Sequence, residues 1–107
     1  MNGPYPKGQL TGGKSVQRTD WSGMKVGNNY RVTTTFIDGD RSAVKAGTVW
    51  TFLGHYFSGF GGIMGMVVSL DGQQEWSIPF RFEENENSEL IDNLSSYIEE
   101  VGEKNAL

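Results

Sequence analysis

Residues 63–82 constrain the fold more than any other segment, because two apolar runs flank the dipeptide Asp71-Gly72. An Asp-Gly pair between β-prone runs is typical of a two-residue hairpin loop, in which both loop residues take a positive φ. In the second run every second residue is large and apolar, which is the period of a strand with one buried face. These residues are Trp76, Ile78, Phe80 and Phe82. The segment therefore predicts an antiparallel β-hairpin.

A two-residue loop also predicts the register of this hairpin. It places Leu70 opposite Gln73 and Val67 opposite Trp76, and a slip of one residue would turn every side chain to the other face. In this register an apolar, methionine-rich row points away from the Trp76 face. The row consists of Met64, Met66, Val68 and Leu70. We expect either a C-terminal helix to cover it or a partner to bind it, since methionines adapt readily to partners.

Other segments have the same strand character. From Tyr30 to Phe36 apolar and polar residues alternate, and Asp38-Gly39 then signals a turn. Residues 48–53 are apolar on both faces, as expected of a covered central strand. We therefore expect an α+β fold, mostly β: a bent antiparallel sheet, or an SH3-like partly open barrel, of four to five strands with one C-terminal helix.

The C-terminal segment predicts an amphipathic helix over residues 88–101, ended by Gly102. Its apolar positions recur at helical spacing: Leu90, Ile91, Leu94, Tyr97, Ile98 and Val101. Residues 1–20 are polar and rich in glycine and proline, so we expect a flexible N-terminal arm. Residues 21–101 then form a single domain, followed by a tail over residues 102–107.

The charge of the chain is divided unevenly. Residues 1–82 carry eight basic and five acidic side chains, whereas residues 83–107 carry one basic and eight acidic ones, for a net charge of −4. This acidity disfavours nucleic acid and anionic membranes as partners and favours a basic protein. No apolar run has the length of a membrane span. For the oligomeric state, the sequence is compatible with both a monomer and a homodimer.

Composition also limits the chemistry that we expect. With no cysteine and a single histidine, the chain predicts no disulfide, no thiol nucleophile, no metal centre and no cofactor. The absence of cysteine fits the cytoplasm. The lone His55 precedes Tyr56 and Phe57, an arrangement without an evident acid or nucleophile, so we expect no enzymatic activity.

Two loops resemble ligand-binding motifs only in part. Residues 38–42 begin like a calcium-binding loop, but its sixth and twelfth places hold Ala43 and Val49 instead of glycine and glutamate. The glycine-rich residues 59–62 open a predicted strand instead of a helix, which argues against a phosphate-binding loop. Both loops are better explained as turns.

Two surfaces are candidates for binding a partner. The first is the polar face of the expected helix, with the acidic residues Asp92, Glu99, Glu100 and Glu103. The second surrounds the glycine-rich loop and offers aromatic and methionine side chains. Its members are Tyr56, Phe57, Phe60, Met64 and Met66.

Three motifs and the acidic closing helix carry a resemblance to a known family. The motifs are Gly27–Val32, Gly47–Gly54 and Gln74–Ile78. Together they resemble a small bacterial family of domains of unknown function, and the first two also resemble SH3-like barrels. The resemblance implies a stand-alone bacterial domain. From the charge and the absence of catalytic groups, we expect a non-catalytic protein-binding or inhibitor module, such as an immunity protein that neutralises a toxin or a phage-type inhibitor. An SH3-like adaptor that binds a peptide or RNA through the aromatic loop is the alternative.

Overall fold

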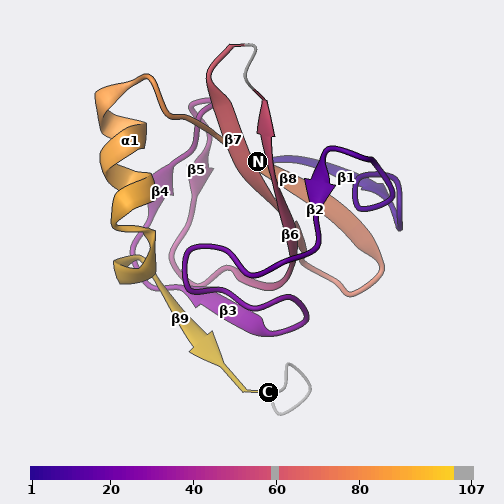
Figure 1. Cartoon of the computed structure of the whole chain (residues 1–107). Coiled ribbons are helices and arrows are strands. Elements are labelled where there is room, and N and C mark those ends of the chain that lie inside the picture. Colours follow the sequence, from indigo (N-terminus) through magenta and orange to yellow (C-terminus); the bar gives the residue numbers. More distant parts are fainter. Residues whose placement is uncertain (59–60, 103–107) are drawn as a thin grey trace.

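The computed structural model describes residues 1–58 and 61–102 (Figure 1). Its strands are β1 Asn2–Pro6, β2 Val16–Gln17, β3 Asn29–Val32, β4 Phe36–Ile37, β5 Ala43–Val44, β6 Val49–Ser58, β7 Ile63–Ser69, β8 Gln74–Arg81 and β9 Ile98–Val101. The helix α1 spans Asn85–Asp92, and a 3₁₀ turn follows at Leu94–Ser96.

Seven strands form one antiparallel sheet in the order β1-β8-β7-β6-β3-β9, with β2 also paired to β6, and β4 and β5 form a separate hairpin. The ten residues of β6 give it the length to pair with β7 on one side and with both β3 and β2 on the other. The expectation of a mostly β, antiparallel fold with one C-terminal helix is confirmed. The sheet is open, with β1 and β9 at its edges, and has more strands than expected because both ends of the chain join it.

The β7–β8 register differs by one residue from the predicted one. Val68 lies opposite Trp76, Met66 opposite Ile78 and Met64 opposite Phe80. The methionine row therefore shares the face of the Trp76 row, and the predicted second apolar face does not form. Met66 and Val68 are fully buried in the core.

The loop between the strands explains the difference. The Asp71 carboxylate accepts hydrogen bonds from the backbone amides of Gln73 and Gln74, both at 2.8 Å. The Ser69 hydroxyl accepts a bond from the Gly72 amide at 2.9 Å. Side-chain capping of this kind stabilises a loop longer than the two-residue turn that Asp-Gly favours.

The other face of the sheet holds Tyr56 directly opposite Gly65. The Tyr56 hydroxyl shares a hydrogen bond of 2.6 Å with the Ser77 hydroxyl of β8. The tyrosine side chain therefore lies across Gly65, where a Cβ atom would come within 2.5 Å of the hydroxyl oxygen. Only glycine leaves room for this crossing.

Residues 1–20 join the sheet instead of forming the expected arm. β1 pairs with β8, β2 pairs with β6, and the segment between them lies over the Tyr56 face. The buried Glu75 carboxylate anchors that segment by accepting bonds from the amides of Gly8, Leu10 and Thr11 at 2.9, 2.8 and 3.1 Å. The Thr11 hydroxyl donates a fourth bond at 2.7 Å. Hydrogen bonds to a charged acceptor thus order a segment that is poor in apolar residues.

The C-terminal helix is shorter than the predicted span 88–101. It ends at Asp92, and the Asn93 side-chain amide donates to the carbonyl of Glu89 at 2.8 Å. The chain then turns and continues as β9, which pairs with β3. Leu90, Leu94 and Ile98 are all buried as the helical pattern predicts, but the last of them lies on a strand.

We predict that Glu75→Gln lowers the free energy of unfolding by about 2 kcal/mol, because one acceptor oxygen becomes a donor facing other donors. The pKa of Glu75 adds a pH dependence. Burial raises this pKa, but the hydrogen bonds from Thr11, Gly8 and Leu10 outweigh burial and hold it below its ordinary value. A depressed pKa gives stability that is present above the ordinary pKa and is lost as pH falls through the folded pKa.

Urea unfolding of the wild type and of Glu75→Gln between about pH 7 and pH 3 measures this contribution. The stability difference is expected to be full at neutral pH and to shrink in acid. A difference that stays constant across this range would show that the carboxylate charge is not what holds the N-terminal segment.

We also predict that Gly65→Ala destabilises the fold by about 2 kcal/mol, because the new methyl group collides with the Tyr56 side chain. Gly102→Ala is the matched control, since a Cβ there meets no atom within 4 Å. Thermal unfolding of both variants compares them directly. Equal melting temperatures would mean that Tyr56 and the Ile78 carbonyl, which a Cβ would approach to 2.6 Å, both move aside without cost.

Candidate functional site

A stacked aromatic pair, of which one ring is exposed and the other half-buried, lies at the end of the core face of the sheet. Phe57 on β6 is 60% exposed and stacks on Phe82, with ring centroids 5.3 Å apart and planes inclined by 19°. Met64 on β7 lies directly opposite Phe57 and packs partly against the core. Apolar area that stays open to solvent in this way is a candidate contact surface.

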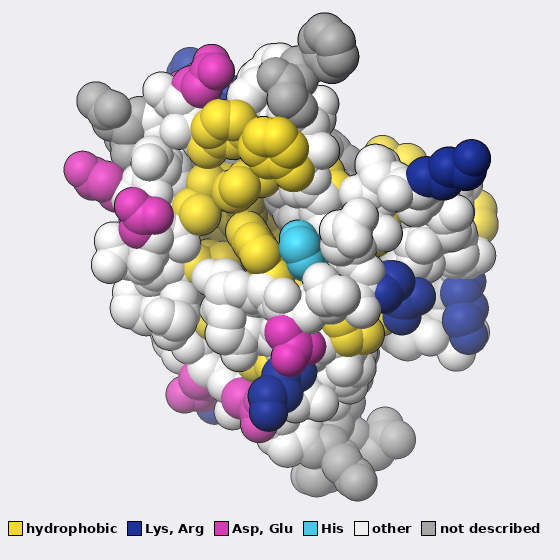
Figure 2. All heavy atoms as spheres, viewed as in Figure 1, with side chains coloured by type: hydrophobic (Ala, Val, Ile, Leu, Met, Phe, Trp, Pro, Cys, Tyr) yellow, Lys and Arg dark blue, Asp and Glu magenta, His cyan; other side chains and the backbone are white. Residues whose placement is uncertain are grey.

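A second stacked pair continues this surface. The Trp21 and His55 rings are 5.9 Å apart and inclined by 12°, and Trp21 also contacts Phe80, which lies opposite Met64. We call Trp21, His55, Phe57, Met64 and Phe82 the aromatic patch. Figure 2 shows the single histidine at the border of a hydrophobic surface over β6 and β7.

The imidazole of His55 is held in place on two sides. Its Nε2 atom shares a hydrogen bond of 2.9 Å with the Thr19 hydroxyl, and the Trp21 ring stacks on it. Burial lowers the pKa of His55 below its ordinary value.

The predicted acidic face is divided in the structure, because Glu99 and Glu100 lie on β9 and not on the helix. Adjacent strand residues point to opposite faces of a sheet. Glu99 forms an ion pair with Arg31. Glu100 accepts hydrogen bonds from the Asn28 amide at 3.1 Å and from the Tyr30 hydroxyl at 3.4 Å. Asp92 lies at the end of α1, apart from both, and Glu103 lies outside the described residues.

Acidic side chains are instead concentrated in the segment that follows the patch residue Phe82. Residues 82–103 contain no lysine or arginine. Glu83 follows the patch residue Phe82 and lies against Gly62, while Glu89 and Asp92 are exposed on α1. We call these three carboxylates the acidic rim, and Figure 2 shows acidic side chains on the α1 side of the patch.

The structure brings together only part of the predicted aromatic site. Phe57 and Met64 lie in the patch, Tyr56 points to the other face, and Met66 is buried. Phe60 lies outside the described residues. Trp21, His55 and Phe82 were not expected as surface residues. The spacing of His55 and Phe57, two residues apart on one strand, is the sequence signal that links them.

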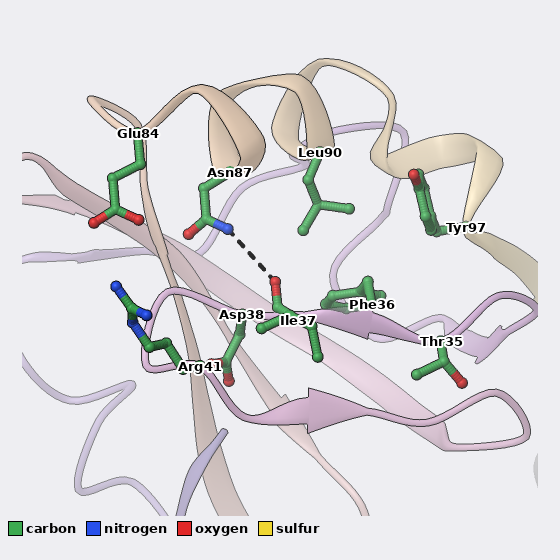
Figure 3. A pocket seen from close by; sticks show the side chains of 9 residues that line it. All are labelled: Thr35, Phe36, Ile37, Asp38, Arg41, Glu84, Asn87, Leu90 and Tyr97. Atoms are coloured by element: carbon green, nitrogen blue, oxygen red, sulfur yellow. Dashed lines mark hydrogen bonds between the residues drawn. The ribbon is translucent and has the colours of Figure 1, made fainter.

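A cleft of about 850 Å³ opens between α1 and the β4–β5 hairpin (Figure 3). Its floor is apolar and comprises Phe36, Leu90 and the ring of Tyr97, which meets Phe36 edge-on at 6.2 Å and 83°. Arg41 and Glu84 lie at one end, where their charged groups point toward each other. The remaining lining residues are Thr35, Ile37, Asp38 and Asn87.

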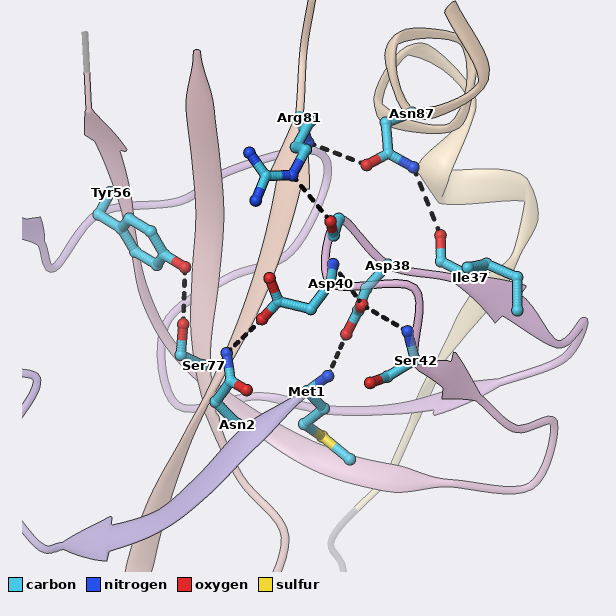
Figure 4. Close-up of polar contacts among 11 residues, drawn as sticks. Met1, Asn2, Ile37, Asp38, Asp40, Ser42, Tyr56, Ser77, Arg81 and Asn87 are labelled. Carbon is cyan, nitrogen blue, oxygen red and sulfur yellow. Dashed lines mark hydrogen bonds and ion pairs between the residues drawn. The ribbon is translucent and has the colours of Figure 1, made fainter. Parts of the chain in front are cut away.

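The hairpin wall of the cleft is fixed by its turn (Figure 4). The buried Asp38 carboxylate accepts bonds from the amides of Asp40 and Ser42 at 2.9 and 3.0 Å, and pairs with the amino group of Met1. Gly39 donates to the carbonyl of Pro79 at 2.7 Å, and its own carbonyl accepts from Arg81 Nε at 3.0 Å. The turn is therefore docked on β8.

The helical wall is fixed by the buried Asn87. Its Oδ1 atom accepts a bond from the Arg81 backbone amide at 2.9 Å, and its Nδ2 atom donates to the carbonyl of Ile37 at 3.5 Å. One side chain thus joins α1 to the end of β8 and to β4. Both walls of the cleft are held by hydrogen bonds to the same strand.

Within residues 1–58 and 61–102, the structure contains no group of three or more side chains arranged to hold a metal ion. No helix in the described part of the chain is long and apolar enough to cross a membrane. No protein-family model matches the chain, and no curated protein matches it. The fold is similar to a solved structure, an integron cassette protein from the mobile metagenome of Vibrio cholerae. The two share 23% sequence identity and a TM-score of 0.72, and the match covers 80% of this chain and 93% of the other. At this identity the likeness concerns the fold alone.

Proposed function

We propose that this chain is a non-catalytic protein-binding module that docks its partner on the aromatic patch. The observation that carries the proposal is Phe57, which stacks on Phe82 yet leaves 60% of its surface in water. Aromatic side chains dominate the energy of protein interfaces because each buries a large area at a low cost in conformational entropy. The neighbouring Trp21–His55 stack extends the same surface.

The acidic rim selects a partner with lysine or arginine beside its apolar contact. Opposite charges at the border of an interface speed association and exclude partners of the same charge. The segment that carries the acidic rim, residues 82–103, contains no lysine or arginine that could neutralise these carboxylates. An inhibitor or immunity protein that blocks a basic target is one form of this function.

The alternative, an adaptor for RNA, is less well supported by the same surface. Stacked aromatic rings bind bases only where basic side chains neutralise the phosphates. The acidic rim would repel them, so a basic peptide or protein suits the patch better than a nucleic acid. The absence of cysteine favours the cytoplasm as the compartment.

We predict that Phe57→Ala weakens partner binding by at least about tenfold while the melting temperature changes by no more than about 3 °C, because the side chain is mostly exposed. Ile37→Ala is the matched control: Ile37 is 51% exposed and lies outside the patch. The wild type and both variants are used in parallel to capture partners from a cell lysate, and the retained protein is then titrated. A partner that binds all three chains equally would place the interface elsewhere.

We also predict that reversing Glu89 and Asp92 to lysine slows association by about tenfold and changes dissociation little, because the rim steers the encounter. Stopped-flow association with the captured partner at low and high salt measures this effect. The difference from wild type is expected to vanish at high salt, where the rim charges are screened. Equal association rates at low salt would show that the acidic rim does not steer the partner.

A further inference from the structure

Arg41 occupies a backbone position that favours glycine. Its φ is 64°, and its amide closes the hairpin turn by donating to the Asp38 carbonyl at 3.1 Å. In such turns the left-handed residue is usually glycine or asparagine, because a Cβ atom crowds the following peptide. A long side chain at such a position is therefore a candidate for a role beyond forming the turn.

The guanidinium of Arg41 is available for a ligand. It is exposed, and within residues 1–58 and 61–102 it belongs to neither of the two ion pairs. Glu84 faces it across the end of the cleft without forming an ion pair (Figure 3). The cleft thus presents the Arg41 and Glu84 groups opposite each other above an apolar floor, while the carboxylate of the third charged lining residue, Asp38, is paired with the Met1 amino group.

The cleft has the size and rigidity of a small-molecule site. Its volume of 850 Å³ falls within the range of about 300–1,000 Å³ that is usual for ligand pockets. Gly39 fixes the turn on β8, where a Cβ atom would come within 3.0 Å of the Phe80 and Arg81 backbone, and Asn87 fixes α1. The backbone of both walls is therefore in place before a ligand enters, and the side chains that have to be ordered are those of Arg41 and Glu84.

We propose that this cleft binds a small zwitterion with an apolar side chain, of the class of free aromatic α-amino acids. The ligand carboxylate pairs with the Arg41 guanidinium, which suits bidentate contact, and the ligand ammonium pairs with Glu84. The side chain lies on Phe36, Leu90 and the Tyr97 ring. An anion alone would be repelled by Glu84 and a cation alone by Arg41, so both charges are needed on one molecule.

Titration of L-phenylalanine into the ¹⁵N-labelled chain, followed by NMR, tests this proposal. We expect saturable shifts of the amides of Phe36, Asp38, Asn87 and Leu90, which line the cleft. Phenylpropionate lacks the ammonium and phenethylamine lacks the carboxylate, and each is expected to bind at least about tenfold more weakly, as the loss of one charged contact implies. No saturable shift with L-phenylalanine, or equal affinity for the three compounds, would overturn the proposal.

Arg41→Gly separates the ligand contact from the fold. Glycine suits the positive φ of residue 41, so this variant is expected to melt at the wild-type temperature or above it, and to lose at least about tenfold in affinity. Lys45→Ala, on the same hairpin but outside the cleft lining, is the matched control. Wild-type affinity of Arg41→Gly would contradict the proposal. Phe57→Ala is expected to bind L-phenylalanine normally, which distinguishes this site from the protein-binding patch.

Discussion

The Asp71 carboxylate determines which side chains lie on each face of the sheet. By capping the amides of Gln73 and Gln74, it fixes the loop between β7 and β8 at a length that pairs Met66 with Ile78. Strand side chains alternate with a period of two, so a register shifted by one residue would exchange the two faces of one strand. The core, the aromatic patch and the cover of the second face all depend on this pairing.

On the core face, the register aligns Phe57, Met64 and Phe80 in one row and His55, Met66 and Ile78 in the next. Trp21 and Phe36 of β4 both pack on Phe80, and α1 packs against β8, so the inner part of this face is covered. Phe57 lies at the end of its row and stays exposed. The patch is therefore the part of a continuous apolar face that the chain leaves uncovered.

On the second face, the same register turns Glu75 toward the N-terminal segment. This carboxylate holds Gly8, Leu10 and Thr11, which lie more than sixty residues earlier in the sequence. The segment is ordered by charge-assisted hydrogen bonds and not by apolar burial. A composition-based prediction of flexibility misses such an anchor, because apolar content says nothing about a single buried acceptor at a distance.

The sequence patterns predicted local structure better than pairing. Alternation identified β3 and β8, apolar runs identified β6 and β7, and the helical stripe identified residues that are buried. The stripe did not distinguish a continuous helix from a helix followed by β9, because Leu90, Leu94 and Ile98 are buried in either case. What decides between them is the free edge of β3, to which β9 pairs, and a local pattern does not contain that partner.

The candidate binding residues follow the same division. Phe57 and Met64 were predicted from the composition around the glycine-rich loop and do lie in the patch. The predicted acidic face required a helix that continues to residue 101, whereas α1 ends at Asp92. Arg41 was not predicted as a binding residue. It stands at the fourth position of the turn at residues 38–41, and only the folded hairpin shows that this position has a positive φ.

Both surfaces depend on the placement of α1. Asn87 and Leu90 point from this eight-residue helix toward the cleft, while Glu89 and Asp92, a hundred or more degrees around its axis, extend the acidic rim. Asn87 fixes the helix through β8 and β4 together. A change at Asn87 would therefore disturb both surfaces at once, whereas Phe57 on β6 and Arg41 in the hairpin turn each belong to one of them. The two surfaces can therefore be altered one at a time through Phe57 or Arg41, whereas the rigidity of both depends on the buried side-chain amide of Asn87.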